Sequence, residues 1–168
     1  AKAEYWCRQG IKVMNMAPDP FRPRVAQRAE PTTANGVHVR FLANEGVLLT
    51  AGQDKVLIDG LFVRYGDYAT PDWRTARHLV LAEPPFDSVD VVLVTHYHGD
   101  HFAPEPVAGH LRYNPRSALV TSQQVIDSLR AGASLTGVAA RRIMPPTMEP
   151  GTRRPDKING VAVELLGV

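Results

Sequence analysis

The stretch VDVVLVTHYHGDHF, residues Val89–Phe102, joins an apolar run to a cluster of histidine and aspartate. Val89 to Val94 is apolar at nearly every position, which is typical of a β-strand covered on both faces. The run has the length of a strand and falls far short of the roughly 18 residues that a membrane span needs. We therefore predict a central strand that ends directly before the histidines.

Four metal-ligand side chains follow this strand within six residues, namely His96, His98, Asp100 and His101. Alternate residues of an extended chain point the same way, so His96 and His98 are placed to offer neutral imidazoles to one cation. A turn at Gly99 swings Asp100 and His101 toward a second cation. The spacing therefore suits two metals side by side. Asp100 is also placed to orient a water or to move its proton as a catalytic group, and the sequence does not separate these roles.

The rest of the chain predicts alternating strands and helices, which indicates an α/β fold. The predicted elements are a strand from 37, a hairpin of 46–50 and 55–58, a helix from Thr70-Pro71-Asp72 to Pro84, a helix at 104–111, a strand at 118–120, a helix at 123–131 and a strand at 161–166. A proline-containing loop is expected between 145 and 155. Residues 1–36 carry scattered Pro and Arg without an apolar period and are predicted to be an extended arm.

With the HxHxDH motif at 96–101, and a strand pair that ends in Leu57-Ile58-Asp59-Gly60, the chain resembles the metallo-β-lactamase-fold superfamily of metal-dependent hydrolases. The resemblance covers about residues 37–168. It implies an αββα sandwich, of which this chain would hold the N-terminal half or somewhat more. It also implies that His96 and His98 bind a first metal and that Asp100 and His101 bind a second, usually zinc and sometimes iron or manganese.

Asp59 matches the acidic position that the family carries at the end of an early strand. The resemblance implies that Asp59 supports the metal loop without binding the metal itself. The local alternative is a strand-end aspartate that caps a turn.

The chemistry of such a site is hydrolytic. A divalent ion with imidazole ligands and an open position lowers the pKa of a bound water from about 15.7 toward about 7 and polarises the bond under attack. We expect a hydrolase acting on a small-molecule lactam, lactone, thioester or phosphoester. The alternative is a non-catalytic metal-binding or scaffold protein that keeps the fold with an incomplete site.

The family completes its sites with a third His, a bridging Asp and a final His, and none has a counterpart before Val168. Val161 to Leu166 is similar to the strand that precedes the third His. We therefore expect a missing C-terminal half or a partner chain to complete the site, and this chain alone to be inactive. His78 and His110 are the nearby substitutes, but both are expected to be surface or half-buried helix histidines, and His38 is judged in the same way.

The chain has 19 basic and 17 acidic residues, and the basic surplus lies in residues 1–40, so the near-neutral body argues against a nucleic-acid partner. A single Cys7 excludes an internal disulfide and a cysteine zinc site. No apolar signal segment precedes Pro18, and the compartment stays open between cytoplasm and an exported location. The sequence contains no P-loop, GxGxxG or GxSxG motif.

Two further groups have two interpretations each. Tyr65, Tyr68 and Trp73 are expected in the core, with the wall of a substrate cleft as the alternative. Arg141-Arg142 and Arg153-Arg154 are expected in solvated loops, with an anionic substrate site as the alternative.

Overall fold

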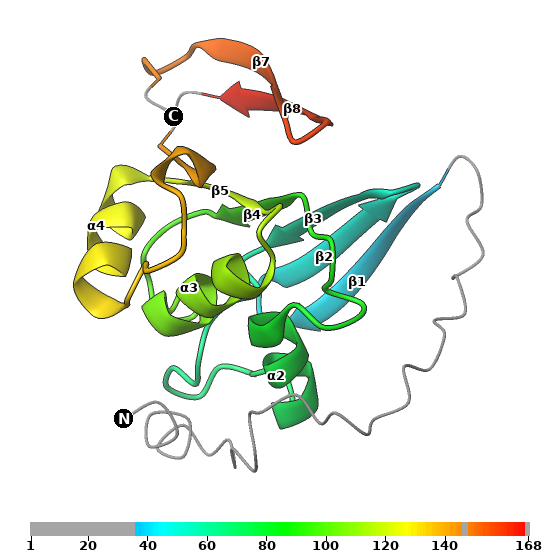
Figure 1. Ribbon diagram of the computed structural model, residues 1–168, viewed down its shortest axis with the longest axis vertical. Helices are drawn as coiled ribbons and strands as arrows, with labels where there is room; N and C mark the ends of the chain where they lie inside the picture. Colours follow the sequence, from blue (N-terminus) through cyan, green and yellow to red (C-terminus); the bar gives the residue numbers. More distant parts are fainter. Residues whose placement is uncertain (1–35, 146–147, 167–168) are drawn as a thin grey trace.

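The computed structural model describes residues 36–145 and 148–166. The predicted arm at 1–36 therefore lies outside the described residues, except for Gly36. The described chain has a mixed α/β fold with one six-stranded sheet and three α-helices (Figure 1). The strands of this sheet are β1 (Val37–Ala43), β2 (Gly46–Ala51), β3 (Asp54–Ile58), β4 (Val91–Val94), β5 (Ala118–Thr121) and β6 (Ile143–Met144).

The strands follow the order of the sequence, from β1 at one edge to β6 at the other. The pairs from β1 to β3 are antiparallel and those from β3 to β6 are parallel. Parallel neighbours need a crossover, and a helix supplies each one. These helices are α2 (Trp73–Leu81), α3 (Pro104–Tyr113) and α4 (Gln123–Gly132), and a short 3₁₀ helix, η1 (Ala140–Arg142), precedes β6. The predicted central strand is confirmed as β4.

The start of α2 differs from the prediction by two residues. The Asp72 carboxylate accepts hydrogen bonds from the backbone N–H groups of Arg74 and Thr75 at 2.9 and 3.2 Å, so Asp72 is the N-cap. The hydroxyl of Thr75 also donates to this carboxylate, and these hydrogen bonds lower the pKa of Asp72. The cap is set by the carboxylate rather than by Thr70, whose position before proline had suggested an earlier start.

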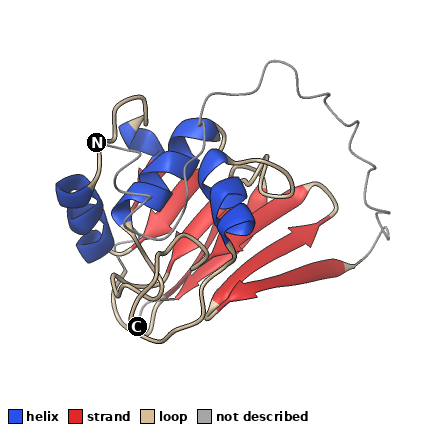
Figure 2. Ribbon diagram, turned by 90° about the horizontal axis from the view of Figure 1, so that it is seen from below, coloured by secondary structure: helices blue, strands red, loops and turns tan. Residues whose placement is uncertain are grey.

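One face of the sheet packs against the helices, as Figure 2 shows. Leu48, Leu57, Val92 and Leu119 lie opposite one another across four neighbouring strands, and all are buried. They form one apolar cluster with residues of the three helices, including Leu79, Val107, Leu111, Val125 and Leu129. This cluster anchors the strands whose ends carry the histidine motif.

The other face of the sheet is also apolar but is only partly covered. A separate antiparallel hairpin, β7 (Arg153–Ile158) and β8 (Val161–Leu166), packs Ile158 and Val161 against Val91 and Val120. Figure 1 shows this hairpin apart from the three helices. At the β1 edge of the same face, the exposed fractions of Val37, Val39 and Phe41 are 65%, 65% and 67%. The sheet therefore has one face that the helices cover and one face that is only partly covered, which we call the unfinished face.

Strand β7 begins inside the loop predicted for 145–155, so that prediction is wrong at 153–155, whereas the described residues 148–152 form no helix or strand. Pro155 lies within β7, opposite Glu164 of β8. Among the described residues β7 has a single neighbouring strand, and a proline is tolerated on such an edge because its missing N–H breaks no second ladder. The Arg153 side chain lies 3.5 Å from the Glu164 carboxylate across this pair.

Other side-chain expectations are also wrong. Tyr65, Tyr68 and Trp73 are about half exposed, so they do not belong to the core. Arg142 is half-buried rather than in a solvated loop, and it donates to the carbonyls of Ser117 and Leu111 at 2.8 and 2.9 Å. Burial lowers the pKa of Arg142, with Arg141 adding a smaller effect of the same sign.

Across the part of the chain that the structure describes, none of the helices combines the length and the apolar character required to cross a bilayer.

Candidate metal centre

The candidate site lies at the carboxyl ends of β3 and β4, which are parallel neighbours. Asp59 follows β3, and Thr95 and His96 follow β4. The loop from Thr95 to the start of α3 is joined to the segment after β3 by a bridge between Leu61 and Phe102. Ligand sites in open α/β sheets commonly occur at this edge, where strand ends place side chains from distant parts of the sequence together.

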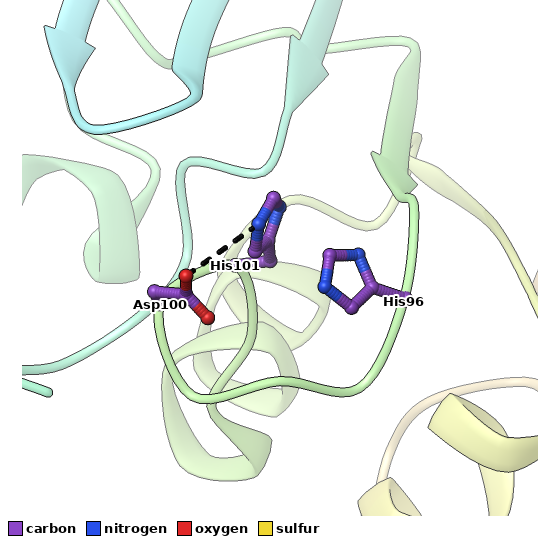
Figure 3. A group of neighbouring side chains, drawn as sticks. All are labelled: His96, Asp100 and His101. Atoms are coloured by element: carbon purple, nitrogen blue, oxygen red, sulfur yellow. Dashed lines mark ion pairs between the residues drawn. The ribbon is translucent and has the colours of Figure 1, made fainter.

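Three of the four predicted ligands converge. The candidate ligand atoms of His96, Asp100 and His101 all lie within 4.8 Å of one another (Figure 3). Asp100 Oδ2 is 3.7 Å from His101 Nε2, and the His96 and His101 rings are 3.9 Å apart between centroids. A tight turn produces this arrangement, because the N–H groups of His101 and Phe102 both donate to the His98 carbonyl at 3.0 Å. The three side chains could therefore hold one metal ion.

The fourth predicted ligand, His98, lies outside this group. Its ring is 4.6 Å from that of His96 between centroids, and its side chain is exposed. The pairing of His96 with His98 on one metal, and of Asp100 with His101 on another, stays a prediction. In the structure His96 lies beside Asp100 and His101.

Asp59 connects the strand ends to the metal loop. Its carboxylate is 3% exposed and accepts hydrogen bonds from the Thr95 hydroxyl and the Thr95 N–H at 2.7 and 2.8 Å. Its Oδ2 also lies 2.9 Å from His101 Nδ1. With Nδ1 donating to a carboxylate, the lone pair of His101 is on Nε2, the atom that faces Asp100. Asp59 thus sets which nitrogen of His101 is available to a metal.

The turn between β1 and β2 also reaches the loop. Asn44 Nδ2 donates to the Asp100 carbonyl at 3.2 Å, and Glu45 Oε2 lies 3.8 Å from His101 Nε2. At Gly46, a Cβ atom would lie 3.1 Å from the Asp59 carbonyl oxygen, so the absence of a side chain permits this close approach. Sequence reasoning missed Asn44, Glu45 and Thr95. The hairpin pattern contains the signal, because pairing β2 with β3 brings the residues before Gly46 to the level of Asp59.

Tyr65 covers the turn of the metal loop. A Cβ atom at Gly99 would lie 2.5 Å from Tyr65 Cδ2, so the ring packs directly on the glycine. The Tyr65 and Tyr68 rings stack with centroids 6.2 Å apart. These aromatic side chains therefore border the candidate site.

The two helix histidines do not join the group. His110 is fully buried, and its Nδ1 donates to the Leu79 carbonyl at 2.6 Å, so the expectation of a surface or half-buried residue is wrong. Burial lowers the pKa of His110 to about 4. His110 is buried because α3 packs closely on α2, with Gly109 directly against Val80. His78 is half-buried as expected, with Nδ1 at 2.8 Å from the Pro84 carbonyl oxygen.

A pocket of about 330 Å³ lies beside α2. Its walls come from Gly60–Arg64, Thr70–Trp73 and residues of α2 and α3. None of the predicted metal ligands lines this pocket, although Gly60 in its wall directly follows Asp59.

Comparison with known proteins leaves the family open. No protein-family model matches the chain. No curated protein matches it either. Among solved structures the chain is similar to a crystal structure named "Putative metal-dependent hydrolase" from Parabacteroides distasonis ATCC 8503, with a TM-score of 0.41, 16% identity and 70% of this chain covered. The match spans 40% of the length of that protein. At this TM-score the similarity assigns neither a fold family nor an activity.

Proposed function

We propose that the protein is a metal-dependent hydrolase of the metallo-β-lactamase fold that uses a metal-activated water on a small-molecule substrate. One observation carries the proposal: His96, Asp100 and His101 converge at a strand end, with His101 oriented by a buried carboxylate. A histidine held in this way is typical of a metal ligand, since the outer hydrogen bond fixes both its orientation and its ligating nitrogen.

The donor set fits zinc. Two imidazoles and one carboxylate are the ligand types that zinc accepts, and three protein ligands leave an open coordination position, as in catalytic sites. Iron or manganese would also accept this mixture of nitrogen and oxygen. We propose that a first metal ion would be bound by the three converging residues. A second metal ion would need His98 and further ligands.

The residues of the chain have separable roles in such a reaction. Bound zinc would supply Lewis acidity and bring the pKa of a coordinated water toward about 7. His96 and His101 would bind the ion, and Asp59 would hold His101 in place. Asp100, whose side chain is 14% exposed, would either complete the ligand set or accept the proton of the attacking water. Tyr65, at the edge of the loop, would contact the substrate.

The unfinished face of the sheet supports an αββα sandwich. Val39, Leu49, Val56, Val91 and Ala118 form one continuous apolar row across five strands. The hairpin of β7 and β8 packs against the β4–β5 end of this face and leaves the β1 end exposed. Because an apolar sheet face is stable when another layer buries it, we propose that further strands, from more chain or from a partner, extend the second layer. The same addition would bring the ligands that the site lacks.

A non-catalytic metal-binding or scaffold protein is the second candidate, because one predicted ligand lies outside the converging group. Zinc-loaded protein, as the full-length gene product, should be assayed on lactam, lactone, thioester and phosphoester substrates, with Asp100→Asn as the control. Hydrolysis that depends on both zinc and Asp100 supports the enzyme. Tight zinc binding without hydrolysis of any substrate favours the scaffold, and absence of zinc binding contradicts both.

A further inference from the structure

We propose that Glu45 supplies a carboxylate ligand to the metal ion bound by Asp100 and His101. This inference rests on the proposed metal centre and adds a residue from the turn between β1 and β2, outside the histidine motif. The site would then draw on three separate parts of the sheet: this turn, the end of β3 and the loop after β4. With Glu45 as a fourth protein ligand, the open position for water would be the fifth on the ion, a coordination number that zinc can reach.

Glu45 and Asp100 both face the same nitrogen of His101. Glu45 Oε2 and Asp100 Oδ2 lie 3.8 and 3.7 Å from the same atom, His101 Nε2. Both distances are too long for a direct hydrogen bond. Zinc ligands at about 2.0–2.2 Å in tetrahedral geometry are separated from one another by about 3.3–3.6 Å. Glu45 is not one of the three residues whose ligand atoms lie within 4.8 Å of one another, so a bound ion would have to draw its half-exposed side chain toward Asp100 and His101.

The turn that carries Glu45 is held against the metal loop by independent contacts. The Asn44 side chain donates to the Asp100 carbonyl at 3.2 Å, which ties the residue before Glu45 to a proposed ligand. Gly46, the residue after Glu45, approaches the backbone of Asp59 and Gly60 closely enough that a Cβ atom would be 3.1–3.2 Å away. Both neighbours of Glu45 are thus in contact with the site, so the backbone holds Glu45 beside it.

The charge balance also favours a ligand role. Asp59 already accepts from His101 Nδ1, so His101 has a hydrogen-bond partner without Glu45. A second and a third carboxylate around the same imidazole bring negative charges together, and a divalent cation compensates them. The Glu45 side chain is 51% exposed, so the geometry is compatible with entry of an ion from solvent.

The test is zinc binding by titration calorimetry, together with the visible absorption of the Co²⁺-substituted protein, which reports the coordination geometry. We expect Glu45→Gln to weaken zinc binding by about 10- to 100-fold or more, and to change the Co²⁺ spectrum. A loss of about 10- to 100-fold is typical when a residue that only hydrogen-bonds to a metal ligand is removed. Glu45→Asp keeps the charge but shortens the side chain, so it should also weaken binding. The control Glu149→Gln removes an equivalent charge before β7 and should stay within about twofold of the parent, because an exposed charge is screened.

Thermal unfolding of each metal-free variant should match the parent, since Glu45 is half exposed on a turn. Parent-like zinc affinity in Glu45→Gln would overturn the inference while leaving the metal centre intact. Parent-like affinity in Glu45→Asp would also overturn it, because the carboxylate would then act by charge rather than by contact. If the parent protein itself fails to bind zinc, the proposed metal function fails together with this inference.

Discussion

Oδ2 of Asp59 lies 2.9 Å from Nδ1 of His101, across 42 residues of sequence. Asp59 belongs to the end of β3 and His101 to the loop after β4, so this contact ties the candidate metal centre to the pairing of two parallel strands. The same carboxylate receives two hydrogen bonds from Thr95, the first residue after β4. The loop is therefore tied directly to the sheet through one buried carboxylate.

Asp59→Asn should preserve the fold and weaken zinc binding by about 10- to 100-fold. Asparagine tolerates the left-handed backbone at this position, where φ is 44°, and keeps an oxygen that accepts from Thr95 N–H. Its amide group facing His101 would favour the tautomer with hydrogen on Nε2, which removes the ligating lone pair. Zinc titration and thermal unfolding of the two proteins check this. Loss of folding, with unchanged affinity in the folded fraction, would make Asp59 a turn cap instead.

Replacing both His96 and His98 by alanine should remove most of the metal that the chain holds after dialysis. His98→Ala alone should remove less than His96→Ala alone, because the His98 side chain is exposed and lies outside the converging group. Metal analysis of the three variants provides the measurement. Equal metal content in the double variant and the parent would show that the site is assigned to the wrong residues.

The stability of the protein should decrease as the pH falls from about 6.5 to about 4 because of His110. Burial lowers the pKa of His110 from 6.5 to about 4, so in this window the unfolded chain binds a proton that the folded chain does not. Protonation of the unfolded chain should therefore lower the free energy of unfolding by about 3 kcal/mol over the whole window. Denaturant unfolding at several pH values measures the slope.

The matched variant for this effect is His110→Asn, which retains a donor for the Leu79 carbonyl without a titrating ring. Its stability should be lower than that of the parent at pH 7 but should change less between pH 6.5 and 4. Parallel pH profiles of the two proteins would assign the acid sensitivity to other groups.

Phe41→Lys should reduce self-association of the chain without changing zinc affinity. Phe41 is 67% exposed on the unfinished sheet face, at the edge strand β1, and such surfaces associate in water. Sedimentation velocity over a range of concentrations measures the change. Arg40→Lys is a control on the same strand that leaves the apolar face unaltered. A parent chain that is monomeric at all concentrations would contradict the proposal that this face receives another layer.

Segments with a strong apolar period could be predicted from sequence. The hairpin of β2 and β3, the strand β4 and the helices α3 and α4 lie within a few residues of their expected positions. Their side chains bury one stripe or one face, which produces a visible pattern. Strand β7 has the sequence RRPDKI and only one buried residue, so it carries no such pattern, and β8 pairing determines it instead.

The candidate site was only partly predictable for a similar reason. A motif within six residues is visible in sequence, and the contact of Asp59 with its loop was inferred only through a resemblance. Glu45 and Asn44 reach the site through the pairing of β2 with β3, which the hairpin pattern indicates, but no motif marks these two residues as part of the site. His110 was misplaced because its burial depends on how closely α3 packs on α2, a tertiary property.

The left-handed backbone of Asp59 also restricts what evolution can place there. Glycine, asparagine and aspartate adopt a φ of 44° most readily, and among them aspartate alone supplies an anionic acceptor. A lineage that abandoned the metal could replace aspartate by asparagine, because asparagine keeps an acceptor for Thr95 N–H and removes a buried charge. A lineage that still uses the metal has no such freedom. The residue found at this one position in natural variants should therefore separate working descendants of the protein from relics.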